Sequence, residues 1–415
     1  MNAQILQLVK ERSDITLSEA VTDSHLYSVF QPIYSFSNQA CIGVEALVRG
    51  RTKISGKALS AYECLQAPDG VSKADYARLI NRMHLINWKE TKLPDSWLFL
   101  NLDFENVTSL NEFCLGDLLS ELEIKGHEVV VEVVESEIKD EALFERLIYI
   151  LRELGCLIAL DDFGAGHSNI DRIWKAQPDI VKLDRQVLLE ATKSMRSQSI
   201  LRNLTQLIQQ AGSISLLEGI ETESQALLAM DAGVDLVQGY YFARPDAYLN
   251  TVEKGQRCIQ QTTESYPAYV AEKQFVKQIQ KKGYETLFEN FSQLESLNCL
   301  EEEMKKLSSL SFVKRFFILD EFGYQISEED EAAIKGAMDI LKKGKGLCWK
   351  NRPYFTTAMQ KHNQVCVSEP YRSLIDMQLC LTVSKTIEFD SGQRYVACFD
   401  VFYHDKSIET VQISV

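Results

Sequence analysis

The chain has 415 residues, of which 45% are hydrophobic and 25% are charged, and this composition excludes a disordered or low-complexity protein. Its net charge of −15 disfavours non-specific binding to nucleic acid or anionic lipid, because both are polyanions. No segment approaches the roughly 18 consecutive apolar residues of a membrane span. Met1–Arg12 lacks the basic and apolar regions of a signal peptide. We therefore expect a cytoplasmic protein, with no nucleic-acid partner and no membrane insertion.

From about residue 26 to residue 245, short apolar runs alternate with amphipathic helical patterns. Such continuous runs are typical of strands buried on both faces of a parallel sheet. Eight strands are predicted, at Tyr27–Tyr34, Cys41–Val48, Trp97–Leu102, Val129–Val134, Leu157–Leu160, Ile180–Leu183, Ile214–Leu217 and Leu236–Tyr241. Helices are predicted at Lys73–Lys92, Asp140–Leu154, Asn169–Ala176, Ser197–Ala211 and Ser224–Ala232. This alternation favours a (β/α)₈ barrel, with an irregular start because the first two strands are joined too closely for a helix.

The remainder of the chain has a different composition. Residues 251–310 are rich in Gln, Lys and Glu, and we expect two or more helices interrupted at Pro267 and Gly283, forming either a dimerising connector or a solvated linker. Residues 311–415 are predicted to form a smaller α+β domain. Its expected elements are a hairpin around Asp320–Gly323, a helix at Glu329–Lys343, and strands at Gln364–Ser368, Gln378–Phe389 and Arg394–Tyr403. Residues 1–250 are predicted to hold the barrel and an N-terminal helix.

The ten cysteines are scattered singly and form no Cys-x-x-Cys pair, and the six histidines show no zinc-ligand spacing. A thiolate zinc site is therefore not expected. In a cytoplasmic protein such cysteines are predicted to be buried, reduced thiols, and a hidden disulfide is the alternative.

Charged and amide residues interrupt the apolar strands at positions where an isolated charge is costly. They are Glu45, Asn101, Glu132, Asp161, Asp162, Lys182, Glu218, Glu221 and Gln238. A single such residue is more simply a solvated or ion-paired side chain, but one in each successive strand is hard to explain in that way. The strand ends of a barrel meet at its C-terminal face, so we expect these side chains to converge there. Oxygen ligands favour Mg²⁺ or Mn²⁺, and two such ions are a common device for phosphodiester hydrolysis.

The motifs that contain these residues resemble the EAL domain family, the bacterial cyclic di-GMP phosphodiesterases. In the order typical of the family they are Gln31-Pro32-Ile33, Glu45-Ala46-Leu47-Val48-Arg49, Asp161-Asp162-Phe163-Gly164, Asp179–Asp184, Glu218–Thr222 and Gln238-Gly239-Tyr240. The resemblance runs from about residue 31 to residue 245. It implies a TIM-like (β/α)₈ barrel that hydrolyses cyclic di-GMP to the linear dinucleotide with one or two Mg²⁺ or Mn²⁺ ions.

The resemblance also implies roles for individual residues. The implied metal ligands are Glu45, Asn101, Glu132, Asp161, Asp162 and Glu218. The implied catalytic residues are Lys182, Glu218, Glu221, Gln238 and Glu135, of which Glu135 anchors the glycine loop. The implied substrate-binding residues are Gln31, Glu45, Leu47, Arg49, Asp184, Arg244 and Pro245. Arg49 suits a phosphate because its planar guanidinium gives two charge-assisted hydrogen bonds.

Three features depart from the family pattern: Val134 stands where Thr is usual, His167 and Asn169 replace Tyr and Ser in the glycine loop, and Gly56–Val71 lacks a proline-and-glutamate stretch. We interpret His167 as a loop residue rather than a ligand. The loop changes leave open an alternative function, a receptor that binds cyclic di-GMP and barely cleaves it. A sugar-processing barrel with paired carboxylates is a third interpretation, and it predicts no metal requirement.

The C-terminal segment resembles PAS or Cache-like sensor domains in Phe316–Gly323 and in Arg352-Pro353-Tyr354-Phe355. This resemblance implies either an unidentified small-molecule ligand or a dimerising role. A homodimer is expected from the families resembled.

Overall fold

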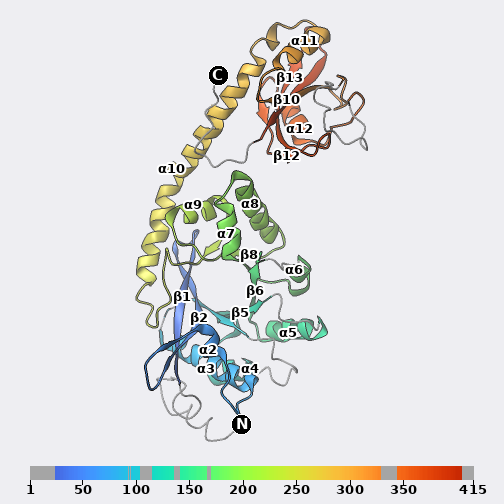
Figure 1. Ribbon diagram of the computed structural model, residues 1–415. Coiled ribbons are helices and arrows are strands. Elements are labelled where there is room, and N and C mark those ends of the chain that lie inside the picture. Colours follow the sequence, from blue (N-terminus) through green and yellow to red (C-terminus); the bar gives the residue numbers. More distant parts are fainter. Residues whose placement is uncertain are drawn as a thin grey trace. The chain divides into compact units, whose positions relative to one another are not determined.

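The computed structural model describes residues 24–91, 93, 95–102, 115–134, 141–165, 170–328 and 344–403. The chain divides into two compact units, Met1–Tyr269 and Val270–Val415. Figure 1 shows strands surrounded by helices in the first unit and a smaller sheet with helices in the second.

The first unit is a closed barrel, as predicted. Its strands are β1 (Ser24–Ser35), β2 (Ala40–Thr52), β3 (Ala58–Leu59), β4 (Trp97–Asn101), β5 (Val129–Val134), β6 (Leu157–Phe163), β7 (Ile180–Leu183), β8 (Ile214–Leu217) and β9 (Leu236–Val237). They are ordered β1-β9-β8-β7-β6-β5-β4-β2-β3, and a further β1–β2 pairing closes the barrel, leaving β3 at its edge. All eight predicted strands are present in the barrel.

The barrel begins irregularly, which confirms the expectation from its closely spaced first strands. β1 is antiparallel to both of its neighbours, β2 and β9, whereas the other strand pairs around the barrel are parallel. A short turn joins β1 to β2, and a turn of that length permits only an antiparallel pair.

The helices of the first unit are α2 (Ala61–Leu65), α3 (Lys73–Thr91), α4 (Leu115–Glu121), α5 (Glu141–Glu153), α6 (Ile170–Ala176), α7 (Arg185–Ala191), α8 (Met195–Gln210) and α9 (Glu223–Asp231), with a 3₁₀ turn η2 (Gly126–Glu128). The five predicted helices are present. The short helices α2, α4 and α7 were not predicted, because one or two turns give too little periodicity to detect. The spacing of Leu143, Leu147, Ile150 and Leu151 in the sequence predicts that these four form the buried stripe of this helix. In the structure α5 instead buries Phe144, Leu147, Ile148 and Leu151.

The second unit contains an antiparallel sheet of five strands, which confirms the α+β prediction. The sheet runs β10-β14-β13-β11, and β12 pairs with β13. Its strands are β10 (Val313–Asp320), β11 (Cys366–Val367), β12 (Tyr371–Arg372), β13 (Leu379–Glu388) and β14 (Arg394–Phe402). The helix α10 (Val252–Glu285) begins in the first unit and ends in the second. The remaining helical elements of the second unit are η3 (Thr286–Phe288), η4 (Phe291–Gln293), α11 (Leu297–Leu307) and α12 (Pro353–Gln360).

Three details of this C-terminal region differ from the predictions or go untested. Pro267 lies inside α10 and does not interrupt it, and Gly283 is also helical. The predicted strand after the Asp320–Gly323 turn is reduced to one bridge, between Leu319 and Gln325. The helix predicted at residues 329–343 lies outside the described residues.

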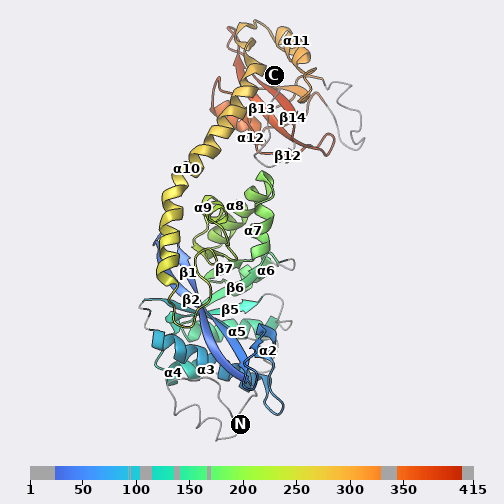
Figure 2. The same cartoon turned by 60° about the vertical axis from the view of Figure 1, so that its left-hand side comes forward.

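The beginning of α10 packs beside β1 in the first unit, as both views show (Figures 1 and 2). The Tyr34 hydroxyl donates a hydrogen bond to the Val252 carbonyl at 3.0 Å. A Cβ atom on Gly255 would lie 2.0 Å from the Tyr34 oxygen. Glycine is therefore required for this close approach of helix to strand.

The cysteines in the described part of the chain are all free thiols, as predicted. The prediction that they are buried is wrong for Cys299 and Cys348, which are exposed, and Cys41 and Cys258 are only half-buried. Among the helices in the described ranges, none is long and apolar enough to cross a membrane.

Candidate active site

One apolar layer of the barrel determines where the polar residues lie. Its members pack against one another: Ile33, Phe99, Val130, Ala159, Ile180, Leu216 and Leu236. Every second side chain of a strand points to the same face. The next positions on that face, two residues further along the parallel strands, are polar: Asn101, Glu132, Asp161, Lys182, Glu218 and Gln238.

The β1–β2 hairpin completes this polar layer. Gly43 of β2 takes the position in the apolar layer, where a Cβ would lie 3.0 Å from the Phe99 ring, and Glu45 takes the next position. Because β1 runs in the opposite direction, Gln31 pairs with Glu45 while Ile33 pairs with Gly43. The structure therefore brings these two predicted residues to the same level as the others.

Lys182 lies at the centre of the acidic residues. Its Nζ atom is 2.6 Å from Glu132 Oε1, 2.7 Å from Glu218 Oε1, 3.1 Å from Asp161 Oδ1 and 3.9 Å from Glu45 Oε1. The Lys182 side chain is only 1% exposed, and that of Glu132 is fully buried. One ammonium group thus faces four carboxylates in a site from which most water is excluded.

Two amide side chains hold Glu45. Asn101 Nδ2 donates to Glu45 Oε1 at 3.1 Å, and Gln238 Nε2 donates to Glu45 Oε2 at 2.7 Å. Each carboxylate oxygen of Glu45 therefore accepts a hydrogen bond from a different side of the barrel, which fixes the orientation of this side chain.

The excess of carboxylates shifts several pKa values. Burial, together with the neighbouring acids, raises the pKa of Glu132 well above its ordinary value and also raises the pKa of Glu218. Burial alone would lower the pKa of Lys182, but the surrounding carboxylates outweigh it and hold that pKa high. The site therefore keeps a charged lysine, and without a further cation its buried acids Glu132 and Glu218 tend to take up protons.

The donor set suits a divalent cation. Glu132 is fully buried, yet neither of its carboxylate oxygens accepts a well-aligned hydrogen bond. Oxygen donors of this kind fit a hard ion such as Mg²⁺ or Mn²⁺. Within the described ranges, no three Asp, Glu, His or Cys side chains are spaced as ligands of one ion, and Lys182 Nζ contacts four of the carboxylates.

Asp161 and Asp162 lie at an irregularity of β6, where the pairing with β7 shifts between Leu160 and Phe163. The Asp162 backbone has φ +55°, a left-handed conformation that is uncommon outside glycine. The Asp161 side chain is buried, and its Oδ1 accepts a hydrogen bond from the Asp162 amide at 2.9 Å. Asp162 is exposed. Of these two aspartates, only Asp161 contacts Lys182.

Four other predicted residues have partners outside this cluster. Glu221 pairs with Arg185 at 2.8 Å, and Asp184 caps α7 by accepting from the Gln186 amide. Arg49 donates to the Val48 carbonyl at 2.8 Å. The Arg244 guanidinium lies 4.3 Å from the centroid of the Tyr240 ring.

Leu47, Arg49 and Pro245 are half-buried and Arg244 is exposed, so these side chains retain accessible surface. Leu47 and Arg49 share one face of β2 with Glu45, because each is two residues from the next. Glu135, His167 and Asn169 lie outside the described residues.

Sequence reasoning missed two contributions to the site. Arg185, which neutralises Glu221, directly follows the Asp179–Asp184 motif but carries no pattern of its own. Gly239 allows a close crossing, since a Cβ there would lie 2.1 Å from the Ile220 carbonyl oxygen. Its place between Gln238 and Tyr240 in a family motif was the available signal.

Residues 15–245 match the family model described as EAL domain. The uncharacterized EAL-domain containing protein YkuI of Bacillus subtilis is 28% identical over 353 residues, covering 79% of this chain and 82% of YkuI. The crystal structure of YkuI in complex with the substrate c-di-GMP and calcium gives a TM-score of 0.72 at 22% identity, covering 91% of this chain and 96% of YkuI. That agreement establishes the shared fold.

Two further relatives match over shorter regions. Cyclic di-GMP phosphodiesterase RocR of Pseudomonas aeruginosa is 33% identical over 133 residues, covering 32% of this chain and 34% of RocR. Oxygen sensor protein DosP of Escherichia coli is 26% identical over 251 residues, covering 58% of this chain and 31% of DosP. The chain thus spans about a third of the length of these two relatives.

Proposed function

The chain belongs to the EAL domain family, and from that premise we propose that it is a cytoplasmic cyclic di-GMP phosphodiesterase that releases the linear dinucleotide. The observation that carries the proposal is the polar layer at one end of the barrel, in which four carboxylates surround Lys182. Support also comes from YkuI, whose crystal structure holds c-di-GMP and calcium, and from the activity named for RocR.

Mg²⁺ or Mn²⁺ is part of the proposal. The residues that would hold it are Glu45, Asn101, Glu132, Asp161, Asp162 and Glu218. When bound, a divalent ion supplies an activated water and stabilises the charge of the phosphodiester. Asn101 and Gln238 orient Glu45 for this role, and Lys182 holds a positive charge beside the carboxylates.

The substrate would lie against the β1–β2 hairpin and the segment after β9. Gln31 and Leu47 offer half-buried surface at the barrel mouth. Arg49 and Arg244 are the cations suited to the phosphates. Arg244 is exposed and Pro245 half-buried, so both are accessible to a nucleotide. Asp184 caps α7 and Glu221 pairs with Arg185. We propose a substrate-binding role for Asp184 and catalytic roles for Glu221 and Glu135.

The first experiment is a chromatographic time course of the purified chain with cyclic di-GMP in Mg²⁺, in Mn²⁺ and in EDTA. Linear dinucleotide is expected with either metal and none with EDTA. Persistent hydrolysis in EDTA would contradict the proposal.

The substitution Glu45→Ala is expected to lower turnover by roughly 100-fold or more, since even the outer partners of metal ligands are worth roughly 10–100-fold. The matched control is Glu190→Ala, because Glu190 is an exposed acid of α7 that pairs only with Lys193 among the described residues. Near-normal turnover by Glu45→Ala would contradict the assignment of this site.

The alternative is a receptor that binds cyclic di-GMP and barely cleaves it. It is favoured by the position of Lys182 between the acids and by the loop residues His167 and Asn169. Calorimetric binding without product in either metal would establish this alternative.

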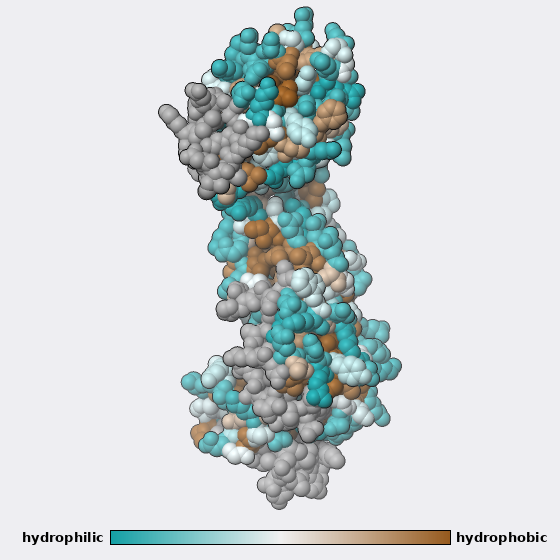
Figure 3. Space-filling model, turned by 90° about the vertical axis from the view of Figure 1, so that its right-hand side faces the viewer, coloured by the Kyte–Doolittle hydropathy of each residue, from teal (hydrophilic) through white to brown (hydrophobic). Residues whose placement is uncertain are grey.

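We also propose that the second unit is a PAS- or Cache-like regulator and that the chain forms a homodimer. Support for a regulator comes from the antiparallel sheet with flanking helices. Figure 3 shows hydrophobic surface on the first unit, and exposed apolar side chains of α7 and α8 include Leu189, Ile200 and Leu207. Surfaces of this kind often mark protein–protein contacts. Light scattering of the purified chain tests the dimer.

A further inference from the structure

A tight hairpin extends β2 beyond the barrel. After Thr52 the chain turns back into β3, which pairs with β2 at Gly50 and Arg51, and the hairpin projects from the first unit near α2 (Figure 2). It continues into the Gly56–Val71 segment, in which the sequence departs from the family pattern. The proposed phosphodiesterase function gives no role to residues 51–57.

Hydrogen bonds hold the turn of this hairpin. The Thr52 amide donates to the Lys57 carbonyl, and the Gly56 amide donates to the Thr52 carbonyl, each at 2.9 Å. The Lys57 amide also donates to Thr52 Oγ1 at 3.1 Å, and the hydroxyl groups of Thr52 and Ser55 lie 2.6 Å apart. Gly56 has φ +66°, a left-handed conformation that glycine adopts without strain. The backbone of the tip is therefore held in place before any partner binds.

Ile54 lies at the tip of the hairpin and is 100% exposed. It therefore gains nothing from burial in the folded chain. The neighbouring helix α2 exposes two more apolar side chains, Tyr62 at 74% and Leu65 at 56%, which lie on one side of the helix because they are three residues apart. The hairpin and α2 thus carry apolar groups that the fold itself does not bury.

The hairpin is also basic, although the protein as a whole is acidic. Residues 46–62 contain no Asp or Glu, whereas the net charge of the chain is −15. Arg51, Lys53 and Lys57 lie within three residues of the tip, and all three are exposed. The next acid, Glu63, completes the capping box of α2. At physiological ionic strength charges are screened over about 8 Å, so the local positive charge determines what the tip attracts.

We propose that this hairpin docks the protein on an anionic lipid surface as a peripheral contact. Ile54 enters the boundary of the apolar layer, and Arg51, Lys53 and Lys57 pair with lipid phosphates. An apolar anchor and a basic cluster reinforce each other in membrane binding. A nucleic acid could pair with the three cations, but it offers no apolar phase for Ile54. The proposal rests on the first unit alone and is independent of the phosphodiesterase activity.

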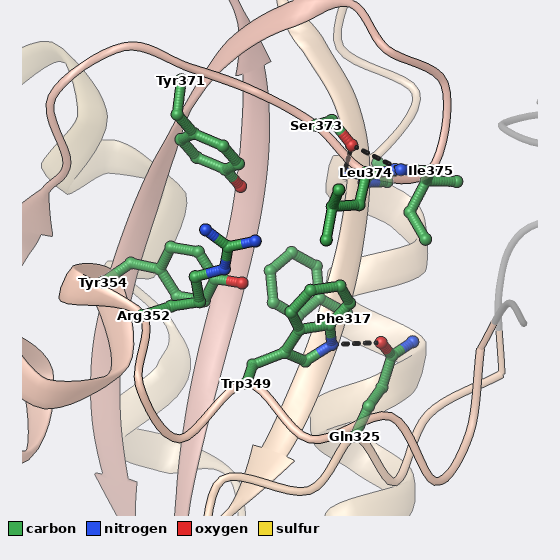
Figure 4. Close-up of a pocket in the computed structure, with 10 residues that line it drawn as sticks. Phe317, Gln325, Trp349, Arg352, Tyr354, Tyr371, Ser373, Leu374 and Ile375 are labelled. Carbon is green, nitrogen blue, oxygen red and sulfur yellow. Dashed lines mark hydrogen bonds between the residues drawn. The ribbon is translucent and has the colours of Figure 1, made fainter. Parts of the chain in front are cut away.

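A lipid chain held inside the second unit would be another way to bind a membrane. The pocket between β10, α12 and residues 371–375 holds about 10 Å³, which is room for about one water and not for an acyl chain. Phe317, Trp349 and Tyr354 are among the residues that surround it (Figure 4). This pocket therefore does not compete with the hairpin as a lipid site.

The test is sedimentation of the full chain with vesicles of phosphatidylcholine, either alone or mixed with about one third phosphatidylglycerol. The anionic vesicles are expected to bind the chain at least about tenfold more tightly than the neutral ones in about 0.1 M salt. Binding is expected to be lost in about 1 M salt, where the screening length falls from about 10 Å to about 3 Å.

Two variants separate the basic and apolar contributions. Lys53→Glu combined with Lys57→Glu is expected to weaken binding to the anionic vesicles by about twentyfold or more, since each cation near such a surface is worth about fivefold. Ile54→Asn is expected to weaken it by about tenfold or more, because the apolar contact is lost. Lys254→Glu and Ile279→Asn, at an exposed lysine and an exposed isoleucine of α10, are the matched controls and bind like the parent chain. Thermal unfolding reports that each variant is folded.

The proposal is overturned if the anionic vesicles fail to bind the chain at lipid concentrations up to about 5 mM, or if phosphatidylcholine alone binds it equally well. It is also overturned if the folded double-lysine variant or the folded Ile54→Asn variant binds like the parent chain. Duplex DNA or RNA that binds more tightly than the vesicles, and does so equally in Ile54→Asn, would assign the hairpin to nucleic acid instead.

Discussion

At the scale of single residues, Lys182 supplies the positive charge that balances the carboxylates of the candidate active site. Four carboxylates lie within 4 Å of its ammonium group. Replacement by methionine leaves these acids without a buried cation, and removing one partner of a buried ion pair typically costs about 3–5 kcal/mol. We expect Lys182→Met to lose about that much unfolding free energy in EDTA and to recover part of it in Mn²⁺, which would supply the missing positive charge.

Urea denaturation followed by circular dichroism measures both effects. Lys193→Met is the control, because Lys193 is exposed and pairs with Glu190 on the surface. That change is expected to alter stability by less than about 0.5 kcal/mol. A Lys182→Met variant as stable in EDTA as the parent chain would show that the acids do not depend on this lysine.

His84 is a second residue with a measurable signature. It is 4% exposed, and burial lowers its pKa from 6.5 to about 3. Its Nδ1 lies 2.8 Å from Ser28 Oγ, which also accepts from Asn87 Nδ2. The hydroxyl proton of Ser28 is therefore available to Nδ1 of a neutral imidazole.

Between pH 6.5 and about pH 3 the unfolded chain binds up to one more proton at His84 than the folded chain. Protonation of His84 in the unfolded chain therefore lowers the free energy of unfolding by up to about 1.4 kcal/mol for each pH unit below 6.5. His84→Gln is expected to flatten the pH dependence of unfolding over that range, measured by urea denaturation. His127→Gln, at an exposed position, controls for the loss of an imidazole. An unchanged pH slope in His84→Gln would contradict the assignment.

At the scale of elements, the end of β9 and the segment after β8 hold each other in place. The Ile220 amide donates to the Gln238 carbonyl at 3.1 Å, and the Tyr241 amide donates to the Ile220 carbonyl at 3.0 Å. Gly239 lies between these bonds with no room for a Cβ. This close contact between the two segments positions Glu218, at the end of β8, and Gln238, at the end of β9, relative to each other.

Gly239→Ala is expected to lower unfolding free energy by about 1–3 kcal/mol, as overpacking does, and to reduce cyclic di-GMP turnover by displacing Gln238. Gly116→Ala is the control, since its Cβ would meet only the flexible end of Leu154. Urea unfolding and the chromatographic assay measure the two effects. Full activity in Gly239→Ala would contradict the coupling.

At the scale of the whole molecule, the segment before β10 supplies part of the core of the second unit. Five of its apolar side chains are buried against the sheet: Leu287, Phe288, Phe291, Leu300 and Met304. Burying one such side chain is worth about 1.5–3 kcal/mol, so the five together contribute an amount comparable with the roughly 5–15 kcal/mol stability of a domain.

We expect a fragment of residues 270–415 to unfold cooperatively and a fragment of residues 311–415 to remain unfolded in the same buffer. Denaturation followed by circular dichroism and by amide proton dispersion measures this difference. Cooperative folding of residues 311–415 alone would instead support the predicted boundary at residue 310.

The sequence by itself determined the barrel, its eight strands and the residues of the polar layer. Strand burial and a period of two are local properties, so Glu132 in a run of valines already marks a buried acid. The three-dimensional structure alone decided that the Lys182 ammonium contacts four of these acids at once and that Gly43 makes room for Phe99. These relations depend on how the barrel closes and how distant segments pack. Such contacts join residues far apart in the chain and leave no periodic signal in it.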